Sequence, residues 1–334
     1  MICVKKITDE AVLKCDINEY TFAGGHYCYN WTLLKELKNG PYKFWNLLKG
    51  LGHMFFFAVY DGESIVMIVP CFRKKKTLIV AGSAEAFDYV DSFYSSKASA
   101  HNRSAAFGAF LDGAKKDGIE KIIWKWCPDD SPSKELLMKQ SSLNIRCEAV
   151  DNTEITFSDY DLHKASLSKS TRQNLRTAVN RLKRDKKDFQ YKISLLDSIT
   201  DSEVEACLDL YYCRQERKYG LGTWRQLIKK HIDFNTRLMR KRKGVIAILK
   251  IDGAVTSFMF GYLNKVDHSL EIPKLAIDDT YGFYSPGMLL VDMTLEALAK
   301  HTDIRKLDLC RGTEQYKLKM GGHIYPTYNF EIKL

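Results

Sequence analysis

The chain has 334 residues, of which 45% are hydrophobic and 28% are charged, and its formal net charge is +10. This composition is typical of a globular protein with more than one domain. The charge is compatible with nucleic acid, an anionic membrane surface or phosphorylated small molecules as partners. No stretch approaches 18 uninterrupted apolar residues, so we expect no transmembrane segment.

Cysteine usage points to a reducing compartment. The nine cysteines are scattered through apolar surroundings and their number is odd, which predicts reduced thiols in a cytoplasmic protein. The sequence has neither a C-x-x-C nor an H-E-x-x-H motif, so no metal site is predicted. The first residues lack the apolar region of a secretory signal.

Two segments of the chain resemble each other. Residues 55–72 and 245–262 each read as strand, turn, strand, with Asp61-Gly62 and Asp252-Gly253 at the turns. Further on, 114–126 and 299–309 each read as the end of a helix, a turn and an apolar strand. Because both pairs have nearly the same offset, we expect a duplicated domain, each copy running hairpin, strand, helix, strand. Two unrelated α+β domains with common local motifs remain the alternative.

A long basic helix is predicted at the start of the second half, over 166–187. Its apolar positions Leu175, Ala178, Val179 and Leu182 follow a helical period, so one face packs and the other carries arginines. The domain boundary is therefore expected near 157–166, which gives domains 1–160 and 161–334.

The second copy has a helix start suited to phosphate. In "DDTYGFYSPGMLL" (278–290), Ser285 suits the N-cap and Pro286 the first helical position. Free amides of Gly287, Met288 and Leu289 at the positive end of the helix would seat a pyrophosphate. A plain helix start is the alternative interpretation. The first copy, 92–116, lacks the Pro-Gly pair.

The second copy also has a polar cluster after its last apolar strand, in "LDLCRGTEQYKLKMGG" (307–322). The first copy has "KWCPDDSPSKELL" (125–137) there instead. The cluster is interpreted as a candidate active-site wall, and a solvated turn with a Glu314–Lys317 helix pair is the alternative. Its chemistry-bearing residues are Asp308, Arg311, Glu314, Tyr316 and Lys317.

Three motifs carry a resemblance to a known family: S-x-x-x-R-x-N-L-R (168–176), YSPGMLL (284–290) and DLCRGTEQYKLKMGG (308–322). Together with the element order they resemble the CelD-like acetyltransferases of the GNAT superfamily, relatives of the Fem-type peptidyltransferases. The resemblance implies an α+β fold of two tandem GNAT-like domains, each a mixed, mostly antiparallel sheet flanked by helices. The usual GNAT phosphate signature is absent, and Tyr284-Ser285-Pro286-Gly287 occupies its place.

The resemblance implies an acyl-CoA-dependent N-acyltransferase with acetyl-CoA as co-substrate and no permanently bound cofactor. The C-terminal domain would bind acyl-CoA through Tyr284–Leu289 and catalyse transfer. The N-terminal domain would be degenerate and lie on the acceptor side. By family analogy, the acceptor is an amine on a sugar, nucleotide-sugar or glycan precursor, as in polysaccharide biosynthesis.

Roles for single residues follow from the chemistry of amide formation. A carboxylate can act as general base, for which Glu271 and Asp308 are candidates, and Tyr316 could protonate the departing thiolate. The expected acceptor-binding residues are Asp88, Asp91, Arg172, Arg311, Glu314 and Lys317. Cys310 has no histidine nearby in sequence to activate it, which favours a buried thiol.

Two other functions stay open at this point. One is a Fem-type peptidyltransferase that uses aminoacyl-tRNA, although the sequence shows no long heptad run. The other is a catalytically silent GNAT-like binding protein, because fold does not fix activity. No DNA partner is expected, tRNA belongs only to the Fem-type alternative, and the chain is expected to be a monomer or a homodimer.

Overall fold

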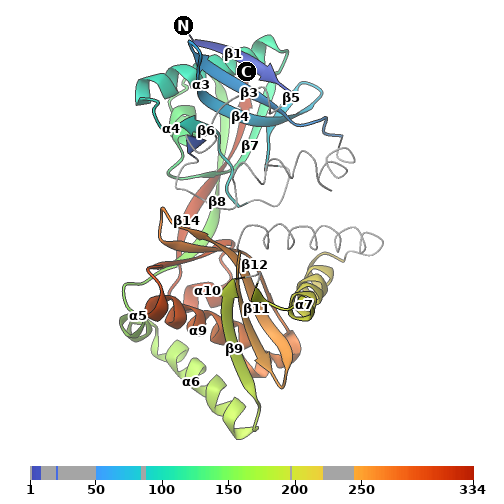
Figure 1. The fold of residues 1–334 in the computed structure, drawn as a ribbon, viewed down its shortest axis with the longest axis vertical. Helices are drawn as coiled ribbons and strands as arrows, with labels where there is room; N and C mark the ends of the chain where they lie inside the picture. The colour runs from blue at the N-terminus through green and yellow to red at the C-terminus, as the bar shows by residue number, and fades with distance from the viewer. Residues whose placement is uncertain (1, 9–19, 22–49, 84–87, 196–197, 221–243) are drawn as a thin grey trace. The chain divides into compact units, whose positions relative to one another are not determined.

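The computed structural model describes residues 2–8, 20, 21, 50–83, 88–195, 198–220 and 244–334 (Figure 1). These residues form two compact units. Unit 1 comprises 1–151 and 326–334, and unit 2 comprises 152–325. Among the described helices, none is long and apolar enough to cross a membrane. The seven cysteines in the described ranges are free thiols.

Unit 1 is built on a mixed, mostly antiparallel sheet with the strand order β1-β3-β4-β5-β7-β14, in which β5 and β7 run parallel. Its core contains aromatic side chains of the sheet and of α3, such as Phe57 and Phe110, whose ring centroids are 5.6 Å apart. The elements are β1 (Ile2–Ile7), β2 (Tyr20–Thr21), β3 (Phe55–Asp61), β4 (Ser64–Lys74), β5 (Thr77–Val80), β6 (Phe93–Ser95), α3 (Ala100–Lys116), β7 (Lys121–Pro128) and α4 (Pro132–Met138).

Unit 2 repeats this plan with the strand order β8-β13-β12-β11-β10-β9, in which β12 and β13 run parallel. Helices α5, α6 and α9 contribute to its core, and α7 packs against β11 and β12. From residue 144 onward the elements are β8 (Asn144–Thr156), α5 (Tyr160–Ser166), α6 (Lys169–Arg184), β9 (Phe189–Leu195), α7 (Asp201–Tyr219), β10 (Val245–Ile251), β11 (Ala254–Asn264), β12 (Ser269–Ile277), the 3-10 helix η6 (Asp279–Tyr284), α9 (Pro286–His301), β13 (Lys306–Arg311), α10 (Gln315–Lys319) and β14 (His323–Lys333). β8 and β14 each contain residues of both units.

Both predicted hairpins are confirmed as β3–β4 and β10–β11. In the second, Asp252 (φ 51°) and Gly253 (φ 78°) both adopt positive φ at the turn, as a two-residue hairpin of this type requires. In the first, Asp61 still pairs with Ser64, so the turn residues are Gly62 and Glu63. The Asp-Gly signal therefore located each hairpin to within one residue.

The basic helix is also confirmed, as α6. Ser168 caps it, with its hydroxyl accepting from the Thr171 amide. The apolar positions Leu175, Ala178 and Leu182 are buried in the core of unit 2, as the helical period predicts.

The two halves of the chain exchange their last strands: β8 of the first half pairs with β13, and β14 of the second half pairs with β7. β8 pairs antiparallel with β13 through residues of unit 2. β14 pairs antiparallel with β7 over Thr327–Lys333, which places the end of the chain in unit 1. The structural boundary thus lies at 151/152, and residues 326–334 leave the second half to complete the first unit.

Candidate active site

A gap opens between two parallel strands of unit 2. β12 and β13 pair at three positions, the last being Glu271 opposite Asp308. Beyond that pair β12 continues to Ile277 and β13 to Arg311, so the two strands separate. We call the space between 272–277 and 309–311 the strand gap.

The edge of β12 points its backbone groups into the strand gap. The Asp278 amide donates to Thr256 O on β11 at 2.8 Å. Backbone groups alternate in direction along a paired antiparallel strand, so those of Leu275 and Ile277 point the other way, toward the gap. Consistent with this direction, Leu275 O accepts from Arg214 Nη1 at 2.6 Å. Such an open edge can pair with an extended ligand that carries amide groups.

Different helices pack on the two faces of this sheet. Ser257 donates to Pro286 O of α9, whereas its neighbour Phe258 contacts Tyr211 of α7, with ring centroids 6.4 Å apart. Adjacent strand residues point to opposite faces, so α9 and α7 lie on opposite sides of the sheet, as Figure 1 shows. Leu270 and Leu307 join the core beneath α9. Their strand neighbours Glu271 and Asp308 therefore face the side of α7.

Glu271 and Asp308 lie opposite each other on the paired strands. Both are buried, Glu271 completely and Asp308 to 3% exposure. Glu271 Oε1 accepts from Asn264 Nδ2 at 2.9 Å. Asp308 Oδ1 accepts from the Cys310 amide at 2.8 Å and from the Tyr325 hydroxyl at 2.7 Å. These bonds fix the orientation of both carboxylates at the point where the strands separate, which suits a general base.

Lys317 organises the turn after β13. Its side chain is buried, and Nζ donates to Leu309 O at 2.9 Å, to Arg311 O at 2.8 Å and to Gly312 O at 3.2 Å. It also pairs with Glu314 Oε2 at 2.9 Å, so the i,i+3 pair considered above is present. An ammonium surrounded in this way holds the backbone of the turn. The structure thus gives Lys317 a structural role in place of the expected acceptor contact.

Tyr316 and Glu314 flank the gap from α10. Burial raises the pKa of the Tyr316 phenol, so this group stays protonated near neutral pH but is a weak acid toward a thiolate. It is therefore better suited to donate a hydrogen bond to departing sulfur than to transfer a proton completely. Burial raises the pKa of Glu314, but the hydrogen bond and charge of Lys317, with the charge of Arg214, outweigh it and hold that pKa below its usual range.

The start of α9 differs in detail from the predicted phosphate seat. Ser285 adopts φ 50° and ψ 50°, and its side chain makes no capping bond. The Leu289 amide already donates to Ser285 O at 3.1 Å, so the expected free amide at Leu289 is not present. In the described part of the chain, the amides of Gly287 and Met288 have no hydrogen-bond partner. The start of α9 therefore has two backbone amides, those of Gly287 and Met288, that can bind an anion.

Gly287 is required by packing. A Cβ at this position would lie 2.3 Å from Cδ1 of Ile277 on β12, and Gly287 is buried. The sequence interpretation, in which the missing side chain lets a ligand approach, is thus replaced by close contact between α9 and β12. A larger residue at Gly287 would disturb the core before it affected a ligand.

Arg181 and Arg184 lie beside the start of α9. The sequence analysis expected them only on the basic face of a helix. Arg181 of α6 donates to Phe283 O at 2.8 Å, and its guanidinium lies 4.2 Å from the centroid of the Phe283 ring. The guanidinium of Arg184 is 5.7 Å from the same ring, which is half exposed. Tyr284 donates to Asp185 Oδ2 at 3.0 Å. The loop before α9 is thus bound to the end of α6, with cationic groups around an exposed aromatic ring.

Two other expected acceptor residues have structural neighbours. Arg172 donates from Nη1 to Ala165 O at 2.6 Å and to Leu167 O, so its guanidinium caps the end of α5. Arg311 is half-buried at the end of β13, and its carbonyl is one of those bound by Lys317. Helix capping accounts for Arg172 without a substrate.

Unit 1 has the corresponding parallel pair, but its gap is filled by its own chain. β5 and β7 pair from Thr77↔Lys121 to Ile79↔Ile123. Past that point the Val90 amide donates to Trp126 O at 2.9 Å, and Trp124 Nε1 donates to Val90 O at 3.1 Å. An extended ligand therefore has no open strand edge here, in contrast to unit 2.

Asp88 and Asp91 belong to this filling segment and are buried. Asp91 Oδ1 accepts from the Ser92 amide at 2.7 Å and Oδ2 from Ser131 Oγ at 2.5 Å. Burial raises the pKa of Asp91 to about 6, against the lowering effect of these hydrogen bonds. Asp91 is fully buried and bonded to Ser92 and Ser131, and its expected contact with an acceptor stays a prediction.

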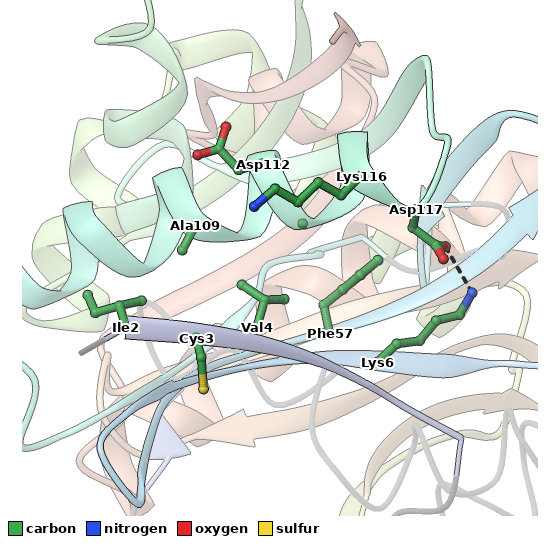
Figure 2. A pocket seen from close by; sticks show the side chains of 10 residues that line it. Ile2, Cys3, Val4, Lys6, Phe57, Ala109, Asp112, Lys116 and Asp117 are labelled. Carbon is green, nitrogen blue, oxygen red and sulfur yellow. Dashed lines mark hydrogen bonds and ion pairs between the residues drawn. The ribbon is translucent and has the colours of Figure 1, made fainter.

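Two cavities lie away from the strand gap. One, of about 590 Å³, lies between β1 and α3 of unit 1, and Figure 2 shows the Lys6–Asp117 ion pair at one end of it (2.9 Å). The other, of about 540 Å³, lies in unit 2 near the start of β13, where Lys306 pairs with Glu154 and Asp267. Neither contains the paired carboxylates of the strand gap.

Comparisons with known proteins concern the fold. Residues 169–318 match the family model described as Acetyltransferase (GNAT) domain. The structure is similar to a conserved protein of unknown function from Bacteroides thetaiotaomicron, with a TM-score of 0.56 and 14% identity over 84% of this chain and 86% of that chain. It is also similar to the C-terminal domain of a protein described as a lysylphosphatidylglycerol synthetase from Agrobacterium fabrum, with a TM-score of 0.53 and 12% identity over 80% and 81%.

A tandem GNAT protein from the clavulanic acid biosynthesis pathway matches with a TM-score of 0.46 and 11% identity, over 85% of this chain and 83% of that chain. No curated protein matches the chain. The predicted α+β class is confirmed: both units are built on mixed, mostly antiparallel sheets with helices, and residues 169–318 match the GNAT domain model. The acetyltransferase-type domain lies in unit 2, which also contains the strand gap.

Proposed function

We propose that the protein is an acyl-CoA-dependent N-acyltransferase of the CelD-like group, which transfers an acetyl group to an amine on a sugar, nucleotide-sugar or glycan precursor. The observation that carries this proposal is the open strand gap of unit 2. It has paired carboxylates where it begins and the two-amide end of α9 at the far end of β12. Unit 1 would take no donor, because its own gap is filled.

The donor would lie along the open edge of β12. Its phosphates would bind the amides of Gly287 and Met288, with Arg181 and Arg184 close by. Its extended arm would pair with the amide of Leu275, whose carbonyl is bound by Arg214, and the thioester would then lie toward the paired carboxylates. Tyr284, Ser285, Pro286 and Leu289 then form the loop and helix start that position these amides.

The reaction requires a neutral amine, a polarised carbonyl and a proton for sulfur. Glu271 or Asp308 would take the proton of the amine, directly or through water, which contributes roughly 10²–10⁴-fold. The amine nitrogen would then bond to the thioester carbon while backbone amides stabilise the oxyanion. As the C–S bond breaks, sulfur leaves as a thiolate and Tyr316 donates a hydrogen bond to it. Alignment of the two reactants can supply about 7–11 kcal/mol of the barrier.

A polyanionic donor other than acyl-CoA is the second candidate, and α6 is the observation that favours it. This helix carries six cationic residues and no acidic one: Lys169, Arg172, Arg176, Arg181, Lys183 and Arg184. An aminoacyl-tRNA donor would bind with a steep salt dependence. A tRNA gel shift across a salt series tests this candidate, and no shift at low salt would exclude it.

Gly282 offers a direct test of the phosphate seat. It is exposed in η6, a Cβ there meets nothing within 4 Å, and its carbonyl accepts from the Ser285 amide. Gly282→Glu should weaken acetyl-CoA binding at least ten-fold in calorimetry, or about 1.4 kcal/mol. Gly282→Gln is the matched neutral control and should bind like the wild type. Equal binding by both variants would refute the seat.

The activity itself is tested by thiol release from acetyl-CoA with a panel of amino sugars. The proposal predicts release that depends on the acceptor and a product that contains an N-acetyl group. Release that is the same with and without every amine would contradict it.

A further inference from the structure

Arg214 of α7 reaches the strand gap and binds the carbonyl of Leu275, which lies 61 residues later in the chain. No sequence motif marks this arginine. Its Nη1 donates to Leu275 O at 2.6 Å. Its charge also acts on Glu314 and Tyr316 across the gap. The guanidinium therefore lies at the open end of the gap, between β12 and α10.

The position of Arg214 is fixed from several sides. α7 begins with a capping box, in which Thr200 and Glu203 bond each other's backbone amides. Glu203 Oε1 also pairs with Lys250 of β10 at 2.7 Å, which lowers the pKa of Glu203 to about 2. One turn beyond Arg214, Arg217 pairs with Asp279 of η6 at 2.5 Å. The helix that presents Arg214 is thus attached to the sheet and to the loop before α9.

Within the described residues, Arg214 uses only a small part of its hydrogen-bonding capacity. In the part of the chain that the structure describes, its side chain makes one hydrogen bond and no ion pair. The positive charge of Arg214 lowers the pKa of Glu314, but Glu314 forms its ion pair with Lys317. A guanidinium has five donors in a planar fork that matches a carboxylate or a phosphate. Arg214 is therefore a positioned cation with donors left for an anion.

The acceptor must approach from the same side. The opposite face of the sheet is filled by the core beneath α9. The face toward α7 carries the carboxylates of Glu271 and Asp308 at the start of the gap. It also carries Arg214, bound four residues further along β12. Four strand residues at about 3.3 Å each separate the backbone of Glu271 from that of Leu275, to which Arg214 is bound, by about 13 Å.

We propose that Arg214 selects amine acceptors that carry a carboxylate or phosphate group several bonds away from the reacting amine. The amine would meet Glu271 and Asp308, and the anion would meet Arg214. This inference rests on the proposed function for the direction of approach. It goes beyond that function because it names the charge and the spacing that an acceptor needs.

Matched pairs of amines test the proposal on the intact chain with acetyl-CoA. One pair is glucosamine 6-phosphate and glucosamine, and the other is 6-aminohexanoate and hexylamine. The wild type should prefer the charged member of at least one pair by ten-fold or more in kcat/KM, and the pair that responds tells phosphate from carboxylate. Arg214→Gln should remove that preference, through a higher KM for the charged amine.

Two further variants separate charge from structure. Arg214→Lys keeps the charge but not the fork and should restore part of the preference. Arg305→Gln removes an exposed arginine at the start of β13 and should leave the preference unchanged. A preference that survives Arg214→Gln, or no preference in the wild type, overturns the role of Arg214 while acyl transfer stands.

Calorimetry keeps the test independent of turnover. 6-Aminohexanoate and glucosamine 6-phosphate are titrated into the wild type and into Arg214→Gln in the presence of CoA. Binding of either one that is lost in Arg214→Gln supports the anion contact even if no acceptor in the panel is acylated. Equal binding to both proteins, or none to the wild type, refutes it.

Discussion

Replacement of Lys317 by methionine removes the ammonium that holds the turn between β13 and α10. Lys317 is 3% exposed and binds three carbonyl oxygens, those of Leu309, Arg311 and Gly312. A hydrogen bond to a charged group contributes about 1.5–3 kcal/mol. Removal of the ammonium leaves three carbonyl oxygens without this donor, and each unsatisfied buried polar group costs about 1–3 kcal/mol.

We therefore expect Lys317→Met to lower the free energy of unfolding by about 3–5 kcal/mol in urea denaturation. Lys319→Met is the matched control, since Lys319 is exposed on the same short helix, and it should change the free energy by less than about 0.5 kcal/mol. Glu314→Gln should cost less than Lys317→Met, because Glu314 is partly exposed and the carbonyl bonds remain. A loss below about 1 kcal/mol for Lys317→Met would refute this account of the turn.

Two more predictions concern buried carboxylates. Asp308→Asn and Glu271→Gln should each keep near-native melting, and the variant that removes the base should lower turnover more than ten-fold in the thiol-release assay; wild-type turnover in both would exclude a carboxylate base at the gap. For Asp91, the folded pKa of about 6 lies above the ordinary 3.8, so the contribution of this one group to stability is full below pH 3.8 and falls by about 3 kcal/mol as the pH rises from about 3.8 to about 6. Asp91→Asn should remove this loss from the stability-versus-pH curve, and an unchanged curve would show that Asp91 is not its source.

Local signals in the sequence predicted much of the fold. The Asp-Gly turns located both hairpins, because positive φ at a two-residue turn restricts the residues that fit. The spacing of Leu175, Ala178 and Leu182 located α6, because those side chains share one face of a helix. The sequence also indicated two strands joined by a crossover helix, but the pairing of Glu271 with Asp308, 37 positions apart in the printed sequence, came from the structure.

The remaining features depend on contacts that sequence patterns do not encode. The charge of Lys317 is visible in the sequence, but the three carbonyls around it result from the turn. Gly287 reads equally well as a ligand contact and as a packing contact, and only the position of Ile277 decides. Arg214 lies at the strand gap because it binds the carbonyl of Leu275, 61 residues later in the chain. The exchange of the final strand into unit 1 is likewise non-local.

The central claim is that the acyl donor binds in the strand gap of unit 2 and not in unit 1. Hydrogen–deuterium exchange of the intact chain with and without CoA tests this claim most directly. The account predicts slower exchange in 274–289 and 309–316, with no change in 88–95 and 121–128. Protection confined to the unit 1 segments, or absent from the edge of β12, would contradict it.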